Sequence, residues 1–379
     1  MDILHYSRLQ NPTNKLLRPH PRLTVPSTSS SLSLRRFSVR SSLPLPVQNA
    51  KYNRELRAAV DAVERACCLC VDVKRSLFTS DGRILEKNDH TPVTIADFGV
   101  QALVSLELGK LFPSIPLVAE EDSAFLRSNN LVNSVVNVVT DKASSQDKAL
   151  TQTDVLEAID RGGKFGPNPA TYWVGLALVV EGHIVLGVMG CPNWRVDKSN
   201  KSTSKISGMI MVAHVGCGTW SKGISDLQNG MNWIKCLVDG YTLVHKGRFC
   251  ISESQTWESL PLSSSFGSTT NVDNVGVKEV LLLPTCCGSL CKYLMVASGR
   301  ASVFIQRARD DRVWDHAVGV ICVQEAGGKV TDWNGDQLDL AADEVERRAL
   351  FPPGGILVSN NSLHKEILHI IASNSTVVS

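Results

Sequence analysis

The chain has 379 residues, of which 43% are hydrophobic and 20% charged, which is ordinary for a soluble globular protein of one large or two modest domains. Residues 1–46 carry seven Lys/Arg and one acid, so the remainder has a net charge of about −4, which excludes a basic surface for nucleic acid. The eleven cysteines are an odd number without a secretory leader, which excludes a disulfide framework and favours core thiols over a metal site.

Residues 1–46 are rich in Arg and Ser, which is the composition of an organellar transit peptide. The stretches Arg35–Ser38 and Arg40–Ser41 offer cleavage sites. The composition favours a mitochondrial address slightly over a chloroplast address, and a disordered basic tail without an address is the alternative.

Residues 47–235 are expected to form an α+β domain. Apolar residues at helical spacing and turn signals predict helices at 51–74, 95–111 and around 154–159, a short buried strand at 117–119, and strands at 173–180, 184–189 and 209–215. The strand at 117–119 would deliver Glu120 at its end, and the strand at 209–215 is expected to be the last of its sheet. Asp97 is expected to cap or support the second helix.

The long apolar run from Tyr172 to Gly190 is interrupted by Glu181, Gly182 and His183. This interruption favours two strands joined by a turn, and the sequence therefore predicts no membrane span.

Residues 236–379 are expected to form a second, α/β domain, because strands and helices alternate along them. The predicted elements are strands at 280–283, 301–305 and 356–358, a helix at 289–299, and a helix around Trp314 that ends at Gly327–Gly328. Asp315 lies in the first turn of this last helix. Its carboxylate can serve the positive end of the helix, or it can point out of the helix end and hold a metal ion.

Two further stretches, Asp89–Asp97 and Leu117–Ser123, accompany the Trp-Asp-His-Ala-Val-Gly sequence around Asp315. Together the three resemble motifs of the inositol monophosphatase superfamily of Mg-dependent, lithium-sensitive phosphatases. Within it the chain is similar to the plant 3'(2'),5'-bisphosphate nucleotidases, from about Lys51 to the C-terminus. The resemblance implies a layered α-β-α-β-α sandwich of two domains. It also implies hydrolysis of 3'-phosphoadenosine 5'-phosphate (PAP) to AMP and phosphate, which removes a by-product of sulfur assimilation.

The resemblance also implies roles for individual residues. Glu120 and Asp315 would bind Mg²⁺, and Asp89 would help to orient the attacking water, although a turn or cap role is equally open for Asp89. Glu121 and Asp122 would make the electrostatic potential of the site more negative.

Nucleotide contacts are implied for Ser289, Lys292 and, with the alignment displaced by one residue, Arg307. A solvated helix lysine is the alternative for Lys292. The family's nucleotide-contacting His has no counterpart in the chain.

The family's Asp-Pro-Ile-Asp-Gly-Thr motif, a source of metal ligands, is missing. Here Ala170–Val174 runs directly into Gly175–Val180, and no Asp-Pro-x-Asp-Gly-Thr occurs elsewhere in the chain. We therefore expect a deletion form, with the first sheet damaged near residues 174–175 and activity lost or strongly reduced. The alternatives are a pseudo-enzyme that binds nucleotide or pairs with an intact copy, and an inositol-phosphate phosphatase. The sequence leaves the oligomeric state open.

Overall fold

The computed structural model describes residues 43–79, 85–86, 92–143, 150–162, 173–194, 208–224, 232–272, 276, 278–283, 285, 288–309, 311–340, 343 and 348–375. All of them belong to one compact unit, Val39–Ser379, which follows a first unit, Met1–Ser38. Asp89 and almost all of the predicted transit peptide lie outside the described residues.

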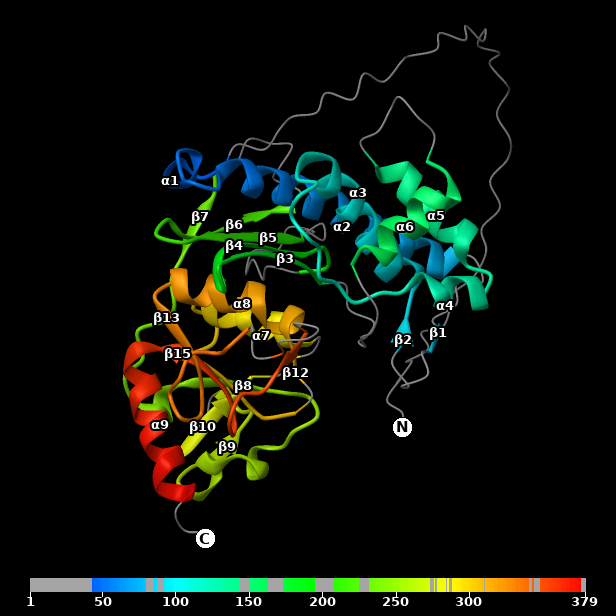
Figure 1. Cartoon of the computed structure of the whole chain (residues 1–379). Coiled ribbons are helices and arrows are strands. Elements are labelled where there is room, and N and C mark those ends of the chain that lie inside the picture. The colour runs from blue at the N-terminus through cyan, green and yellow to red at the C-terminus, as the bar shows by residue number, and fades with distance from the viewer. Residues whose placement is uncertain are drawn as a thin grey trace, which may run out of the picture. The chain divides into compact units, whose positions relative to one another are not determined.

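Helices precede the first sheet along the chain (Figure 1). They are α1 (Leu45–Gln48), α2 (Asn53–Thr79), α3 (Ile95–Leu111), α4 (Ser123–Ser128), α5 (Val132–Lys142) and α6 (Gln152–Asp160), with a small ladder of β1 (Leu85–Glu86) and β2 (Pro92–Val93) before α3. The start of α3 is fixed by a capping box between Thr94 and Asp97, which confirms the supporting role predicted for Asp97.

The first sheet is antiparallel, with strand order β3-β4-β5-β6-β7. Its strands are β3 (Val174–Val180), β4 (His183–Cys191), β5 (Met209–His214), β6 (Gly218–Gly223) and β7 (Ile234–Cys236). The predicted hairpin is confirmed: Glu181 and Gly182 both have positive φ, as a two-residue hairpin turn requires.

The second sheet has strand order β13-β15-β11-β8-β10-β9, and β9, β10, β8 and β11 run parallel to one another. Its strands are β8 (Arg248–Ile251), β9 (Gly267–Thr269), β10 (Glu279–Leu282), β11 (Val303–Arg307), β13 (Gly328–Asp332) and β15 (Gly355–Asn360). Helices α7 (Gly288–Ala297), α8 (Val313–Glu325) and α9 (Asn361–Ser375) accompany it, and β12 (Asp311–Arg312) pairs with β14 (Ala349–Leu350).

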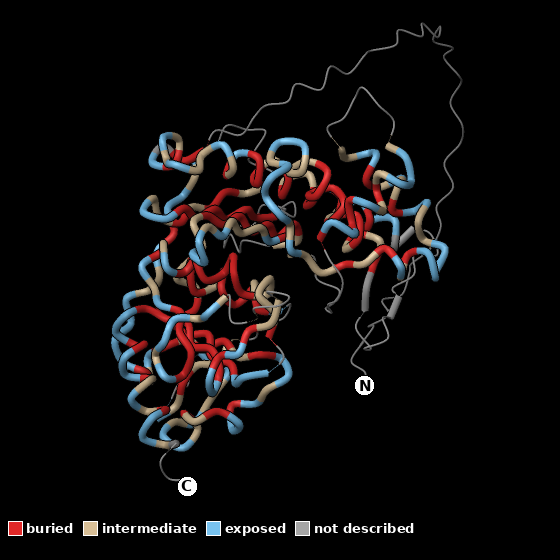
Figure 2. The backbone as a smooth tube through the Cα atoms, in the orientation of Figure 1, coloured by how far each residue is buried: buried red, intermediate tan, exposed pale blue. Residues whose placement is uncertain are grey.

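Helix and sheet layers alternate, which confirms the expected α-β-α-β-α architecture. Gly190 of β4 leaves room for Val63 and Cys67 of α2 on one face of the first sheet, and Gly187 leaves room for Val318 and Ile321 of α8 on the other face. Helices α7 and α8 share a core with β11 and β15, and α9 covers the outer face of the second sheet. Figure 2 shows the strands and the helices between them as largely buried.

Three expectations about single elements were wrong. Residues 117–119 form no strand: Val118 is 47% exposed, and the segment makes one backbone bond, from Ala119 N–H to the Gly162 carbonyl. β5 does not end its sheet, because a turn at residues 215–217 returns the chain as β6. The polar segment after Ser123 holds α4 and α5 in addition to α6, since Val135, Val139 and Leu126 reach a small core against α3.

The ladder of the first sheet is continuous at Val174–Gly175, where damage was expected. Val174 pairs with Gly190 and Gly175 pairs with Met189, and the one irregularity lies further on, between Leu178 and Val179. The reason is topological: among the described strands β3 lies at the edge of its sheet, and residues on both sides of the junction, Val174 and Gly175, pair with β4.

The packing of α8 against α7 depends on Gly319. A Cβ at this position would collide with the ring of Tyr293, which is fully buried. We expect Gly319→Ala to lower the free energy of unfolding by about 1–3 kcal/mol, despite alanine's higher helix propensity. Urea unfolding measures this. The control is Gly240→Ala, because no atom would lie within 4 Å of a Cβ there; equal effects of the two changes would contradict the argument.

Two buried groups should give opposing pH dependences of stability. Burial lowers the pKa of His364 to about 4, while its ring nitrogens contact the hydroxyls of Thr331 and Ser359 at 2.9 Å. Burial, reinforced by the charge of Asp61, raises the pKa of Glu64 to about 7. The contribution of His364 is present above pH 6.5 and is lost as pH falls toward 4. The contribution of Glu64 is present below pH 4.5 and is lost as pH rises through 7.

We therefore expect the wild-type free energy of unfolding to change little from these two groups between pH 4.5 and 6.5. Glu64→Gln should lose stability as pH falls across this window, and His364→Gln should gain it, each by up to about 3 kcal/mol. Thermal unfolding of the three chains at pH 4.5, 5.5 and 6.5 measures the slopes. Parallel slopes in all three would show that neither group titrates differently on unfolding.

In the part of the chain that the structure describes, no helix combines the length and apolarity needed to cross a bilayer.

Candidate active site

The parallel strands of the second sheet end where two helices begin. Ser252–Gln255 follow β8, Arg307 ends β11, Ser289 lies in the first turn of α7, and Asp315 lies in the first turn of α8. The carboxyl ends of parallel strands beside helix N-termini are the usual place for ligands in such sheets. This edge is therefore the candidate site.

Asp315 is held at the buried end of α8. No side chain caps this helix, whose N-cap is Arg312. Burial raises the pKa of Asp315, while the nearby charges of His316, Arg309 and Arg312 act to lower it. A partly buried carboxylate in this state would gain from a cation or an added donor, and its role as a metal ligand stays a prediction.

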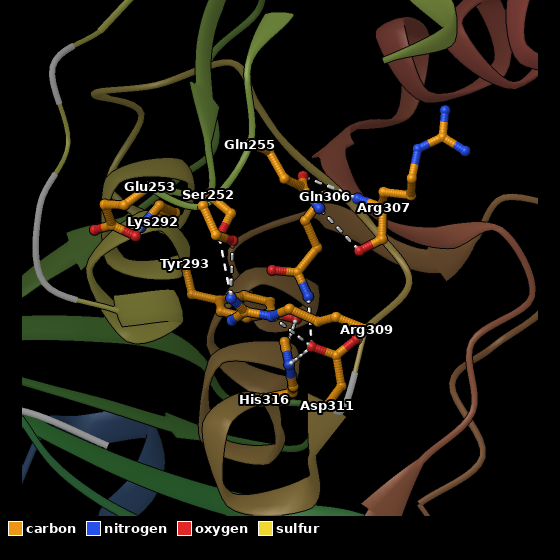
Figure 3. Close-up of polar contacts among 11 residues, drawn as sticks. Ser252, Glu253, Gln255, Lys292, Tyr293, Gln306, Arg307, Arg309, Asp311 and His316 are labelled. Atoms are coloured by element: carbon orange, nitrogen blue, oxygen red, sulfur yellow. Dashed lines mark hydrogen bonds and ion pairs between the residues drawn. The ribbon is translucent and has the colours of Figure 1, made fainter. Parts of the chain in front are cut away.

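A buried network centres on Asp311, two residues before α8 begins (Figure 3). One oxygen, Oδ1, accepts hydrogen bonds from Gln306 Nε2 at 2.7 Å, Arg309 Nε at 3.2 Å and His316 Nε2 at 3.3 Å. Burial acts to raise the pKa of Asp311, but the hydrogen bond and charge of His316 and the charge of Arg309 together lower it. Asp311 is thus an ionised carboxylate in the protein interior that accepts from three side chains.

The same network fixes the ring of His316. Because ionised Asp311 accepts from Nε2, that nitrogen carries a proton, and Nδ1 lies 3.0 Å from the Tyr293 hydroxyl, whose proton it accepts when the ring is neutral. Tyr293 and His316 are fully buried, and they join α7 to α8. We refer to Tyr293, Gln306, Arg309, Asp311 and His316 as the Asp311 network.

Lys292 and Ser289, both predicted to contact nucleotide, are buried in α7. The Lys292 ammonium donates to Glu253 Oε2 and to the Gly288 carbonyl, each at 3.0 Å. The Glu253 carboxylate is partly buried, which acts to raise its pKa, but the hydrogen bond from Lys292 lowers it overall. The positive charge of Lys292 is therefore paired with the Glu253 carboxylate within the protein.

Arg307 points away from the Asp311 network, and Arg309 extends toward Ser252 (Figure 3). The Arg307 guanidinium donates to the Ser259 carbonyl at 2.7 and 3.2 Å and lies over the Trp333 ring. Sequence reasoning missed Arg309 and Asp311. The available signal was the charged stretch 309–312 immediately before the Asp315 helix.

Glu120 lies in the segment between α3 and α4, whose backbone is anchored on both sides. Gln101 of α3 accepts from the Glu121 amide at 2.6 Å and donates to the Glu121 carbonyl at 2.8 Å. The Ser123 amide donates to Asp160 of α6. Asp122 accepts from the Ala124 amide and caps α4, so its carboxylate has a structural use in addition to any effect of its charge.

The described residues do not by themselves fit a magnesium site. Within the ranges the structure describes, no three Asp, Glu, His or Cys side chains gather closely enough to hold a metal ion. Glu120 and Asp315 supply one carboxylate each from separate segments, and Mg²⁺ needs octahedral oxygen ligands. Asp89 lies outside the described ranges.

Comparison with known proteins relates this fold and site to one family. The sequence profile of the inositol monophosphatase family matches residues 168–376. An Arabidopsis thaliana protein named "Putative 3'(2'),5'-bisphosphate nucleotidase, mitochondrial" is 60% identical over 375 aligned residues, covering 91% of this chain and 94% of that protein. A Dictyostelium discoideum 3'(2'),5'-bisphosphate nucleotidase is 32% identical, covering 83% of this chain and 95% of its own.

Solved structures agree in fold. Inositol monophosphatase II of Staphylococcus aureus superposes with a TM-score of 0.51 at 10% identity, covering 86% of this chain and 96% of its own. The IMPase of Thermotoga maritima gives 0.50 at 18% identity, covering 86% and 100%. The structural similarity shows the fold, and the sequence matches show the family. The chain belongs to the inositol monophosphatase family.

Proposed function

We propose that the chain is a phosphomonoesterase of the 3'(2'),5'-bisphosphate nucleotidase type, acting on PAP to give AMP and phosphate. The observation that carries this is the 60% identity, over 91% of the chain, to a relative bearing that name. The candidate site supports this proposal with the acid Asp315 and with Arg309, which both lie near the carboxyl ends of parallel strands.

We further propose that this chain is a deletion form with strongly impaired activity. The 375 aligned positions span 91% of a 379-residue chain, about 345 residues, so about 30 positions of the Arabidopsis relative have no counterpart here. The missing Asp-Pro-x-Asp-Gly-Thr sequence falls between Val174 and Gly175, the first two residues of β3, where the ladder is continuous. Mg²⁺ is the metal proposed for an intact chain, and we derive no catalytic step through it here.

A pseudo-enzyme is the second candidate function. It is favoured by the retention of Asp315 and the Asp311 network in a chain that lacks the motif. Such a chain would bind nucleotide, or pair with an intact copy, without turnover. An inositol-phosphate phosphatase is the enzymatic alternative, because the family profile and the solved structures carry that name.

One set of measurements separates these functions. Phosphate release is followed from PAP and from inositol 1-phosphate with Mg²⁺, and calorimetry measures the binding of both. Slow but measurable release from PAP supports the nucleotidase. Binding of PAP without release supports the pseudo-enzyme, and preference for inositol 1-phosphate overturns the nucleotide assignment.

We propose a mitochondrial location, with chloroplast as the alternative, from the basic N-terminal composition and the name of the Arabidopsis relative. Leu43 and Val47 are buried in the core beneath α2, so the mature chain should begin before Leu43. We expect a chain starting at Ser41 to match the full chain in melting temperature. A chain starting at Gln48 should lose at least about 2 kcal/mol of stability. Equal melting temperatures of the two shortened chains would contradict this.

A further inference from the structure

A bisphosphate substrate carries two anionic groups, so the site needs a cation for the phosphate that is not cleaved. Three cationic side chains lie near the carboxyl ends of β8 and β11. Lys292 is paired with Glu253, and Arg307 is bound to the Ser259 carbonyl and stacked on Trp333. Arg309 remains.

Arg309 is oriented by protein contacts on one side of its guanidinium. Nε donates to Asp311 Oδ1 at 3.2 Å, and Nη1 donates to Ser252 Oγ at 3.2 Å and to Ser254 Oγ at 3.5 Å. The side chain is 36% exposed, whereas its partner Asp311 is fully covered. Among the described residues Nη2 has no hydrogen-bond partner, which leaves one edge of the planar fork for a ligand.

The charge of Arg309 is not cancelled by Asp311. That carboxylate oxygen also accepts from Gln306 and His316, so its charge is shared among three donors. Arg309 is also close enough to Asp315 for its charge to act on that carboxylate. The guanidinium therefore lies at the same end of the sheet as the candidate ligand and carries positive potential toward it.

We propose that Arg309, together with the hydroxyls of Ser252 and Ser254, binds the phosphate of the substrate that is not hydrolysed, and so makes the site prefer a bisphosphate to a monophosphate. This inference rests on the proposed function and adds to it a specificity-determining residue. Arginine suits this role because its charge is permanent and because Asp311 and the two serines fix the guanidinium so that Nη2 can donate to a phosphate oxygen.

The test is the binding of PAP and of adenosine 3'-phosphate, which keeps the phosphate that is cleaved and lacks the other one, measured by calorimetry without metal. For the full chain we expect PAP to bind at least about 10-fold more tightly than adenosine 3'-phosphate, since charge-assisted hydrogen bonds are strong. Arg309→Gln should weaken PAP binding by about 10- to 100-fold and leave the binding of adenosine 3'-phosphate almost unchanged, and Arg309→Lys should fall between them. Arg75→Gln, on α2 with a side chain that is 77% exposed, is the control and should keep the wild-type ratio.

Melting temperatures confirm that each variant is folded, and Arg309→Lys keeps the charge should the Gln variant unfold. Wild type that binds PAP no better than adenosine 3'-phosphate, or an Arg309→Gln variant that keeps the ratio, overturns the inference. Failure of the proposed function is distinct from this. It would appear as a chain with the motif restored that does not hydrolyse PAP, even though Arg309→Gln still abolishes the preference for PAP.

Discussion

Inserting the missing segment between Val174 and Gly175, with its Asp-Pro-Ile-Asp-Gly-Thr sequence, should raise the rate of phosphate release from PAP by at least about 10²–10³-fold. Loss of a single preorganised charge-stabilising group costs about this much, and the motif contributes several such groups. The gain follows because the described residues do not gather three ligand side chains, although Asp315 and Glu120 are present. The assay is steady-state phosphate release with Mg²⁺, at equal concentrations of folded protein.

The control for that experiment is an insertion of the same length in which both motif aspartates are asparagine. It rebuilds the chain length and the turn but supplies no carboxylate. We expect it to remain as slow as the present chain. If it were as fast as the full insertion, the effect would come from the architecture and not from the ligands, and if neither insertion raised the rate, the deletion hypothesis would be wrong.

Replacing Asp311 with alanine should lower the free energy of unfolding by about 3–5 kcal/mol. The change would leave the Gln306 amide, the Arg309 Nε–H and the His316 Nε2–H without their common acceptor, inside a buried region. Removing one partner of a buried charged network has a cost of this size. The lowered pKa of Asp311 means that its contribution is present at neutral pH and is lost below the ordinary carboxyl range, so pH 7 is the condition for the measurement.

Urea unfolding of Asp311→Ala is compared with that of Asp141→Asn. Asp141 pairs with Lys142 on the surface and its side chain is 62% exposed, so its loss should change stability by no more than about 0.5 kcal/mol. The Asp311→Ala chain should also lose its preference for PAP over adenosine 3'-phosphate, because Arg309 would no longer be oriented. A variant of unchanged stability would show that the network is replaced by water.

Local sequence signals predicted the regular elements well. Helical spacing and turn signals gave the bounds of α3, and the interruption at Glu181–Gly182 gave the hairpin of β3 and β4. The strand predicted at 117–119 failed because a three-residue apolar run does not show whether a neighbour will pair with it. β6 was missed because its turn depends on Glu325, whose carboxylate receives the Gly216 and Gly218 amides from more than a hundred residues away.

Residues of the candidate site were predictable from the sequence only where they belong to a recognisable motif. Asp315 was found in this way, although its role as a metal ligand remains a prediction. The partners of the charged and polar side chains were not predictable, because they are distant in the sequence. Lys292 pairs with Glu253, which is 39 positions away, and Tyr293 contacts His316, which is 23 positions away. The sequence alone does not distinguish the surroundings of Arg307 from those of Arg309, because they are the same residue type two positions apart. They differ because β11 ends between them, and the chain then bends toward β12.

The edge position of β3 has a consequence for handling the protein. Its seven residues, Val174–Val180, include no charge and no proline, and Val179 is 44% exposed. Natural edge strands usually carry gatekeepers such as lysine or proline, which discourage templated growth by other extended chains. Concentrated solutions of this protein should therefore tend toward aggregates nucleated at β3, and a single lysine at Val179 should extend its shelf life.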